Sequence, residues 1–333
     1  MASFVEWLDK FCISRHNAGM NYAHSTPHSP SYDRHMVSNA YIVQSYAKIN
    51  LTLDVLGKRS DGYHELATVM QTVDLYDTLC FVATDEDRVS ISCNQPELCN
   101  DENLVVRAAQ AIRKRLNLTQ GLLIELHKRI PVAAGLGGGS GNAAAVLQAL
   151  QRWWQLPLDA RELWSMAAEL GSDVPFFLSG GLALCEGRGE KITPLELHWP
   201  LAMRWLLLIK PAIAVSTARV FRNLTVNHYS MGTESRNVQA ALQSKSPLEP
   251  TDLHNSLERG VIEQYPEVAQ ARKAVIDAGA DYVRLSGSGP TLFTSFSTLA
   301  AATQVQQCLQ TQGYEVYLTR PIHPGGDEIQ FFS

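Results

Sequence analysis

Residues 131–145 of this sequence join a glycine-rich loop directly to an apolar stripe of helical spacing, a junction suited to holding phosphate. The candidate phosphate-binding residues are Pro131, Val132, Ala133, Ala134, Gly135, Leu136, Gly137, Gly138, Gly139, Ser140 and Gly141. Because glycine has no Cβ, the backbone N–H groups of such a loop approach a ligand closely. The stripe predicts a helix that begins at about Ser140, and the N-terminal end of a helix stabilises an anion.

Two common phosphate loops do not match this stretch. A P-loop requires lysine before Ser or Thr at the helix start, whereas Ser140-Gly141-Asn142 contains no lysine. The dinucleotide-binding pattern fails because Ser140 stands where its third glycine belongs. The alternative is a flexible turn between a strand at 122–126 and the helix. We favour a ligand site because a plain turn does not offset the backbone entropy of so many glycines.

Three polar side chains elsewhere suit proton and phosphoryl transfer. Alternating apolar residues over 41–56 predict a strand with one apolar face, so Lys48 and Asn50 share its polar face and can reach one ligand. Pro175 and the aromatic pair after it predict an extended, buried connection, with the Asp173 carboxylate at the edge of the core. Singly, Lys48 is better explained as a solvated lysine and Asp173 as a turn-capping carboxylate. Together with the loop they favour a catalytic pair in which Lys48 holds Asp173 ionised.

Periodicity and turn chemistry predict the elements that position these residues. Arg59-Ser-Asp-Gly62 predicts a turn that places Tyr63 and His64 at the start of a second strand. A capping box at Asp159 and Glu162 predicts a helix that ends at Gly171. Further helices are expected at 103–116, 252–262 and 266–278, and strands at 66–82, 122–126, 205–210, 282–286, 291–296 and 314–319. The mixture predicts an α+β fold.

We expect two domains flanked by terminal extensions. Past Pro211 the composition changes to helices and strands of a second α+β unit, with the boundary near Pro194 to Pro200. This predicts an N-terminal domain over 39–197 and a C-terminal domain over 198–323, followed by a tail at 324–333. Residues 1–38 are rich in Ser, His, Asn, Tyr and Pro, which predicts a disordered extension. A translation start at Met36 would remove most of it.

The composition is that of an ordinary soluble protein of 333 residues, 45% hydrophobic and 18% charged. Lys+Arg 28 against Asp+Glu 33 gives a net charge of −5, so we expect neither nucleic acid nor an anionic membrane as partner. No run of about 18 apolar residues predicts a membrane-spanning helix. The 6 cysteines are scattered without metal-ligand spacing, so we expect reduced thiols and no protein-held metal.

With these residues assembled, the sequence resembles the GHMP kinases, a superfamily of small-molecule kinases, over about Ser45 to Phe293. The motifs that carry the resemblance are Ala47-Lys-Ile-Asn-Leu51, Arg59-Ser-Asp-Gly-Tyr-His-Glu-Leu66, Ile130 to Ser140, Gly171-Ser-Asp-Val-Pro175 and Ser286-Gly-Ser-Gly-Pro290. The first two of these motifs narrow the resemblance to the members of the superfamily that act on a cytidine-diphosphate-linked methylerythritol. This sequence departs from the pattern at Gly141, where a second serine is usual, and before Ala47, where proline is common.

The resemblance implies a two-domain fold with the active site in the cleft between domains. It implies phosphoryl transfer from ATP, with Mg²⁺ arriving on the nucleotide, to the 2-hydroxyl of the methylerythritol moiety, a step of non-mevalonate isoprenoid biosynthesis. Asp173 would be the base with Lys48 beside it, and residues 131–141 would wrap the ATP phosphates. The substrate-binding residues would be Asn50 and His64, with Tyr63 and Phe221 stacked on cytosine. The expected state is a cytoplasmic monomer or homodimer, or a plastid stromal protein if residues 1–38 act as a transit peptide.

Two other functions stay open. Another GHMP kinase, for mevalonate or homoserine, would have the same loop but lacks the Tyr63-His64 context. A non-catalytic nucleotide sensor on the same fold would lack the base, whereas Asp173 is present.

Overall fold

The computed structural model describes residues 40–196, 198–248, 250–323 and 330–332. They belong to one compact unit that spans Asn39–Ser333. The extension predicted over residues 1–38 lies outside the described residues, and the division into two domains at residue 197 stays a prediction. None of the helices in the described part of the chain combines the length and the apolar character needed to cross a bilayer.

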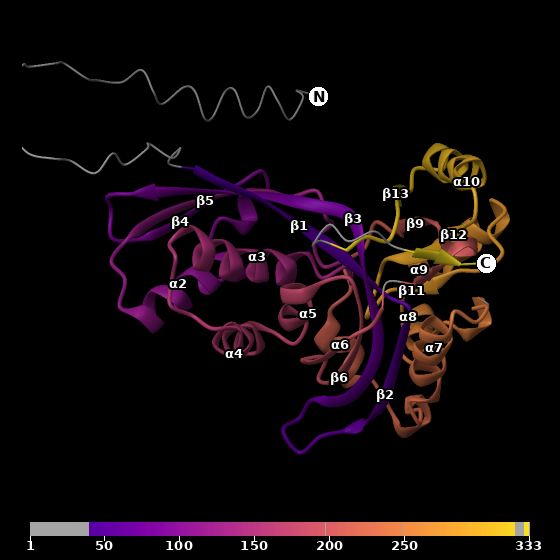
Figure 1. Ribbon diagram of the computed structural model, residues 1–333. Helices are drawn as coiled ribbons and strands as arrows, with labels where there is room; N and C mark the ends of the chain where they lie inside the picture. The colour runs from indigo at the N-terminus through magenta and orange to yellow at the C-terminus, as the bar shows by residue number, and fades with distance from the viewer. Residues whose placement is uncertain (1–39, 197, 249, 324–329, 333) are drawn as a thin grey trace, which may run out of the picture. The chain divides into compact units, whose positions relative to one another are not determined.

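Among the described residues, eight strands form a sheet around the long strand β3 (Figure 1). The strands are β1 (Ala40–Asn50), β2 (Thr52–Lys58), β3 (His64–Thr84), β4 (Val89–Cys93), β5 (Gly121–His127), β6 (Leu182–Gly187), β7 (Lys191–Pro194) and β10 (His254–Asn255). β3 pairs antiparallel with β2 and β6 along its first part and with β1 and β5 along its second. One strand therefore runs from the Tyr63-His64 turn past the whole of β1.

Four helices pack on one face of this sheet (Figure 1). They are α2 (Leu104–Leu116), α3 (Gly138–Trp153), α4 (Ala160–Leu170) and α5 (Val174–Ser179). Phe81 and Ile124 of the sheet form a buried cluster with Ile112 of α2 and Leu147 of α3. The Asp159 side chain accepts from Glu162 N and Glu162 bonds back to Asp159 N, so the predicted capping box begins α4. The apolar stripe after the glycine loop thus anchors α3 against the sheet.

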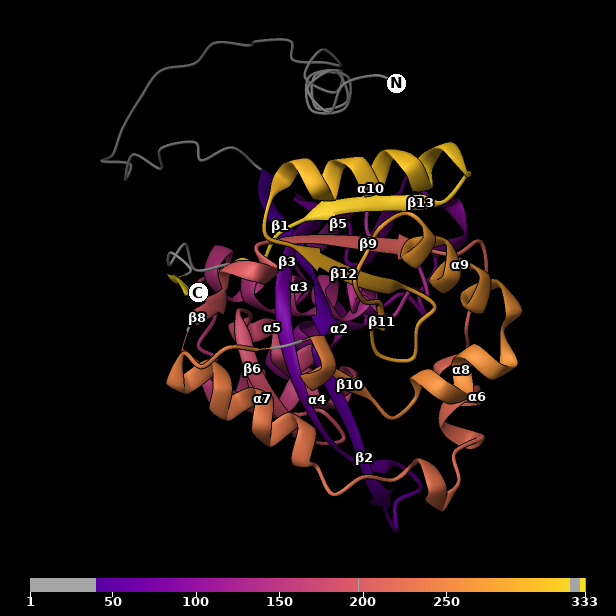
Figure 2. The ribbon, with the colours of Figure 1, turned by 90° about the vertical axis from the view of Figure 1, so that its right-hand side faces the viewer.

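A second, antiparallel sheet has the order β11-β12-β9-β13, and α10 runs alongside β13 (Figure 2). The strands are β9 (Trp205–Lys210), β11 (Arg284–Leu285), β12 (Leu292–Phe296) and β13 (Glu315–Thr319), and β8 (His198–Pro200) pairs with β14 (Gln330–Phe332) apart from it. The helices of this half are α6 (Thr217–Arg222), α7 (Thr233–Ser244), α8 (Glu258–Gln264), α9 (Pro266–Asp277) and α10 (Leu299–Thr311). Short 3₁₀ helices are η1 (Pro96–Leu98), η2 (Leu201–Met203), η3 (Val226–His228) and η4 (Pro250–Asp252).

The two sheets share apolar packing. Ile49 and Val69 of the first sheet lie in one buried cluster with Leu208 and Phe293 of the second. Polar side chains where β1 passes into β2 are buried as well: Lys48 and Asn50 are 3% and 2% exposed, and Thr52 and Asp54 are 0% exposed. The predicted polar face of this strand is therefore an interior surface, and its charges need partners inside the protein.

Three sequence predictions are wrong in detail. The loop helix begins at Gly138, before Ser140. The segment after Asp173 is the helix α5 and not an extended connection, because proline suits the first turn of a helix, where its missing N–H has no partner to lose. The helix predicted at 252–262 begins only at Glu258, because His254 and Asn255 pair with β2 and are held extended.

Candidate active site

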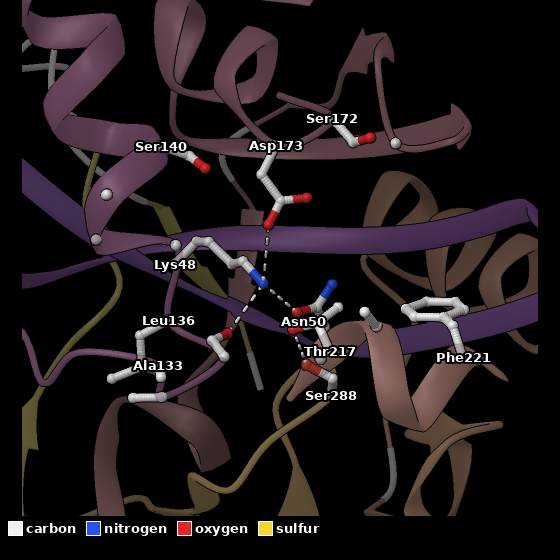
Figure 3. A pocket seen from close by; sticks show the side chains of 18 of the residues that line it. Lys48, Asn50, Ala133, Leu136, Ser140, Ser172, Asp173, Thr217, Phe221 and Ser288 are labelled. Carbon is white, nitrogen blue, oxygen red and sulfur yellow. Dashed lines mark hydrogen bonds and ion pairs between the residues drawn. The ribbon is translucent and has the colours of Figure 1, made fainter. Parts of the chain in front are cut away.

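A cavity of about 940 Å³ collects nearly all of the predicted site residues (Figure 3). Its lining includes residues 131–140, together with Lys48, Asn50, Tyr63, His64, Asp173 and Phe221. Gly141 does not line it: a Cβ there would lie 2.9 Å from Ser45 Oγ, so a side chain at this position would point to β1. The loop, the strand β1, the start of α5, the β2–β3 turn and the helix α6 thus meet around one space.

The glycine loop is shaped by close backbone contacts. Gly135 and Gly137 have φ angles of 74° and 70°, a region that side-chain-bearing residues rarely adopt. A Cβ on Gly135 would lie 2.4 Å from the backbone oxygen of Ser286, so only glycine fits there. Gly137 is the N-cap of α3 and has no side chain to cover the first turn. The first-turn N–H groups of α3 therefore stand at the cavity wall as anion donors.

A buried ion pair holds the segment that leads into this loop. One Asp77 oxygen accepts from the backbone N–H groups of Arg129 at 2.7 Å and Ile130 at 2.8 Å. The other oxygen pairs with the Lys128 ammonium, and both side chains are buried. Removing either charge would leave the other unpaired in the interior, which is strongly unfavourable. The entry to the glycine loop is thus anchored to β3.

Lys48 lies at the centre of the cavity on β1. Its Nζ donates to Asn50 Oδ1 at 2.6 Å and to Gly135 O at 3.0 Å, and lies 3.6 Å from Asp173 Oδ2 (Figure 3). Its backbone N–H donates to Leu136 O at 2.9 Å, which fastens β1 to the loop. The ammonium is therefore held between the carboxylate and the glycine loop, a position from which a positive charge can stabilise an anion in the cavity.

Asp173 occupies the N-cap position of α5, and its side chain is 33% exposed. This exposure leaves the carboxylate open to the cavity, with the Lys48 ammonium 3.6 Å away. Burial, with a further contribution from Asp173, raises the pKa of the neighbouring Cys185 thiol, so that thiol stays protonated. Cys185 is fully buried, so of these two groups only Asp173 is open to the cavity.

The other end of the cavity is aromatic. His64 lies 5.4 Å from Phe221 and 6.1 Å from Tyr229, measured between ring centroids. Tyr63 is 53% exposed, and the Arg188 guanidinium lies 4.9 Å from its ring centroid. Burial, and after it the positive charge of Lys58, lowers the pKa of His64. A neutral imidazole offers one donor and one acceptor, a pattern that suits the edge of a pyrimidine.

Several lining residues were not identified from the sequence. Thr217 and Ser288 share a hydrogen bond of 2.8 Å that ties α6 to the turn at 286–290. That turn connects β11 with β12, as a tight turn should, and also contributes Gly287 and Ser288 to the cavity. Arg188 stands between two glycines that indicate only the end of a short strand, and Thr217 sits in a stretch without a local pattern. For these lining residues, the only usable signal in the sequence lies in the glycines of the turn at 286–290.

The sequence of this chain is similar to family models and to proteins of known name. The model of the GHMP kinases N terminal domain matches residues 103–181, and that of the GHMP kinases C terminal matches residues 238–315. A 4-diphosphocytidyl-2-C-methyl-D-erythritol kinase of Pelotomaculum thermopropionicum is 41% identical over 283 residues, covering 84% of this chain and 96% of that protein. One of Geobacillus kaustophilus is 44% identical over 253 residues, covering 75% and 86%.

Solved structures extend the likeness to the fold. A crystal structure of 4-(cytidine 5′-diphospho)-2C-methyl-D-erythritol kinase matches with a TM-score of 0.71 at 31% identity, over 84% of this chain and 99% of that one. Homoserine kinase from Cytophaga hutchinsonii matches with a TM-score of 0.67 at 20% identity, over 89% and 99%, and shares the fold. From its two domain matches and from relatives that align over nearly their whole length, this chain belongs to the GHMP kinases, in the family of 4-diphosphocytidyl-2-C-methyl-D-erythritol kinases.

Proposed function

We propose that this enzyme transfers the γ-phosphoryl group of ATP to the 2-hydroxyl of 4-diphosphocytidyl-2-C-methyl-D-erythritol. The relatives that align over most of the chain have this kinase activity in their names. The observation that carries the proposal is the placement of Asp173 and Lys48, 3.6 Å apart, beside the glycine loop in one cavity.

In the reaction, Asp173 accepts the proton of the 2-hydroxyl. The oxygen of that hydroxyl attacks the γ-phosphorus, and ADP leaves. The Lys48 ammonium offsets the charge that spreads over the phosphoryl oxygens. A positioned general base of this kind is worth roughly 10²- to 10⁴-fold in rate. Residues 131–140, which line the cavity, are the proposed cradle for the phosphates.

Magnesium fits the loop end of the cavity. Ser140 and Asp173 supply a hydroxyl and a carboxylate there, and such oxygen donors, together with phosphate oxygens, are the ligands that Mg²⁺ prefers. When bound with ATP, the ion neutralises charge on the phosphates.

The aromatic end of the cavity is the proposed site for the cytidine. Tyr63 and Phe221 present ring faces for stacking on the base, which is worth about 1–3 kcal/mol per base in other proteins. His64 and Asn50 offer hydrogen bonds to the substrate. A substrate without a pyrimidine would leave this aromatic end unfilled, which disfavours mevalonate and homoserine.

The release of ADP tests the proposal directly. With ATP and magnesium, purified enzyme should release ADP with the cytidine-linked alcohol and not with mevalonate or homoserine. ADP release with one of the smaller alcohols would support the other kinase function. Binding of ATP without ADP release on any of the three would support a sensor.

A further inference from the structure

A line of buried polar groups continues from Lys48 into the sheet. Asn50 Oδ1 accepts from Lys48 Nζ at 2.6 Å, and Asn50 Nδ2 donates to Thr68 Oγ1 at 2.8 Å. The Thr68 hydroxyl in turn donates to the backbone oxygen of Thr52 at 2.5 Å. Asn50 is 2% exposed, and Thr68 and Thr52 are 0% exposed. Bulk water therefore does not replace these bonds.

The chemistry of these groups permits one orientation of the Asn50 amide. A protonated lysine only donates hydrogen bonds, so the amide must turn its oxygen to Lys48 and its NH₂ to Thr68. The Thr68 hydroxyl has a single proton, and that proton is committed to the Thr52 carbonyl. Its oxygen is thus left as an acceptor facing Asn50. A flipped amide would bring NH₂ against the ammonium and lose both bonds.

We propose that Thr68 is a positioning residue for phosphoryl transfer. Through Asn50, its hydroxyl holds the Lys48 ammonium between the Asp173 carboxylate and the carbonyl of Gly135. This inference rests on the proposed kinase activity. Valine has nearly the shape of threonine and also favours β-strands, so Thr68→Val removes the hydroxyl with little change in strand preference.

Replacing the hydroxyl by a methyl group tests this role. Thr68→Val should lower kcat by about 10- to 100-fold, because small misplacements of catalytic groups have effects of this size, and should change the KM for ATP by less than about threefold. Thr68→Ser keeps the hydroxyl and should retain kcat within about threefold. The matched control is Thr294→Val on β12: among the described residues, the buried Thr294 hydroxyl has no hydrogen-bond partner, and its loss should leave kcat unchanged.

A double-mutant cycle separates action through Asn50 from general damage. In an Asn50→Ala background, measured by single turnover at high enzyme concentration, Thr68→Val should cause no further loss. An equal loss in both backgrounds, a Thr68→Ser variant as slow as Thr68→Val, or a Thr68→Val variant with normal kcat would each overturn the proposal. If Thr68→Val does not fold, as judged by thermal unfolding, Thr68→Ala takes its place. Wild-type turnover is measured first, and its absence would refute the proposed function instead.

Discussion

At the scale of single residues, the site depends on the buried ammonium of Lys48, which has a polar partner on each of three sides. Lys48 is 3% exposed, a state that is costly for an ammonium unless other groups replace its water. Asn50, Gly135 and Asp173 do so within 3.6 Å. Two of these partners, Asn50 and the carbonyl of Gly135, are neutral, so their bonds to the ammonium do not depend on the charge of the carboxylate.

Asp173→Asn should abolish turnover, with kcat lower by about 10²-fold or more, because an amide cannot accept the hydroxyl proton. The affinity for ATP, measured by calorimetry, should stay within a few fold, since Lys48 keeps its bonds to Asn50 and Gly135. Asp277→Asn, an equal charge change on the exposed face of α9, is the control and should be silent. Normal turnover of Asp173→Asn would refute its role as the base.

The lowered pKa of His64 predicts the pH dependence of substrate binding. A lowered pKa means that the neutral ring persists to a lower pH than the ordinary value of 6.5. The KM for the cytidine substrate should therefore be constant from pH 8 to 6.5 and rise only at lower pH, while the KM for ATP shows no matching rise. His64→Gln should remove this rise. A rise that is already complete above pH 6.5 would contradict the assignment.

At the scale of elements, the glycine loop is determined by what lies behind it as much as by its own residues. Ala133, Gly135 and Gly137 all have positive φ angles, and the Ser286 carbonyl lies against Gly135. The turn at 286–290 is thus the back wall of the loop, although it follows about 150 residues later in the chain. Asp77 and Lys128 hold the other side of the loop entry.

Gly135→Ala should impair both the fold and ATP binding. Its Cβ would meet the Ser286 backbone at a φ angle that alanine rarely adopts, so the free energy of unfolding should fall by more than about 1 kcal/mol. The KM for ATP should rise at least about tenfold as the loop moves. Gly139→Ala is the matched control for stability. Gly139 lies within α3, and a Cβ there would be at an ordinary 3.7 Å from the Leu104 side chain of α2. Equal melting temperatures of the two variants would show that the contact with Ser286 does not matter.

At the scale of the whole molecule, the site depends on both halves of the chain. Lys48, the glycine loop and Asp173 come from the first sheet and its helices, whereas Phe221, Thr217 and Ser288 come from the second half. β10 pairs with β2, and Ile49 and Phe293 share a buried cluster, so the halves are fastened beside the cavity.

Deleting residues 1–35 should leave both folding and turnover unchanged. All of the proposed site residues lie within the compact unit Asn39–Ser333. The truncated and full-length proteins should have the same melting temperature and the same kcat. A truncated protein that is insoluble, or that melts several degrees lower, would show that the extension contributes to the fold.

The sequence by itself determined the local structure and the chemistry of this protein. Its periodicity located α2, α9 and β9 closely, its capping box located α4, and its glycines located a loop that lines the cavity. The shared face of Lys48 and Asn50 also followed from the two-residue repeat of a strand. These features depend on neighbours in the chain, which is why a pattern could reveal them.

Only the tertiary structure decided that the polar face of β1 is buried, that Arg188 covers Tyr63, and that Ser288 meets Thr217. The tertiary structure also placed Thr68 next to Asn50. Nothing in the sequence indicated this contact, because threonine is common in strands. Such contacts join residues far apart in the chain, and they form because two sheets bury their apolar surfaces against each other. Local propensity contains no information about that packing.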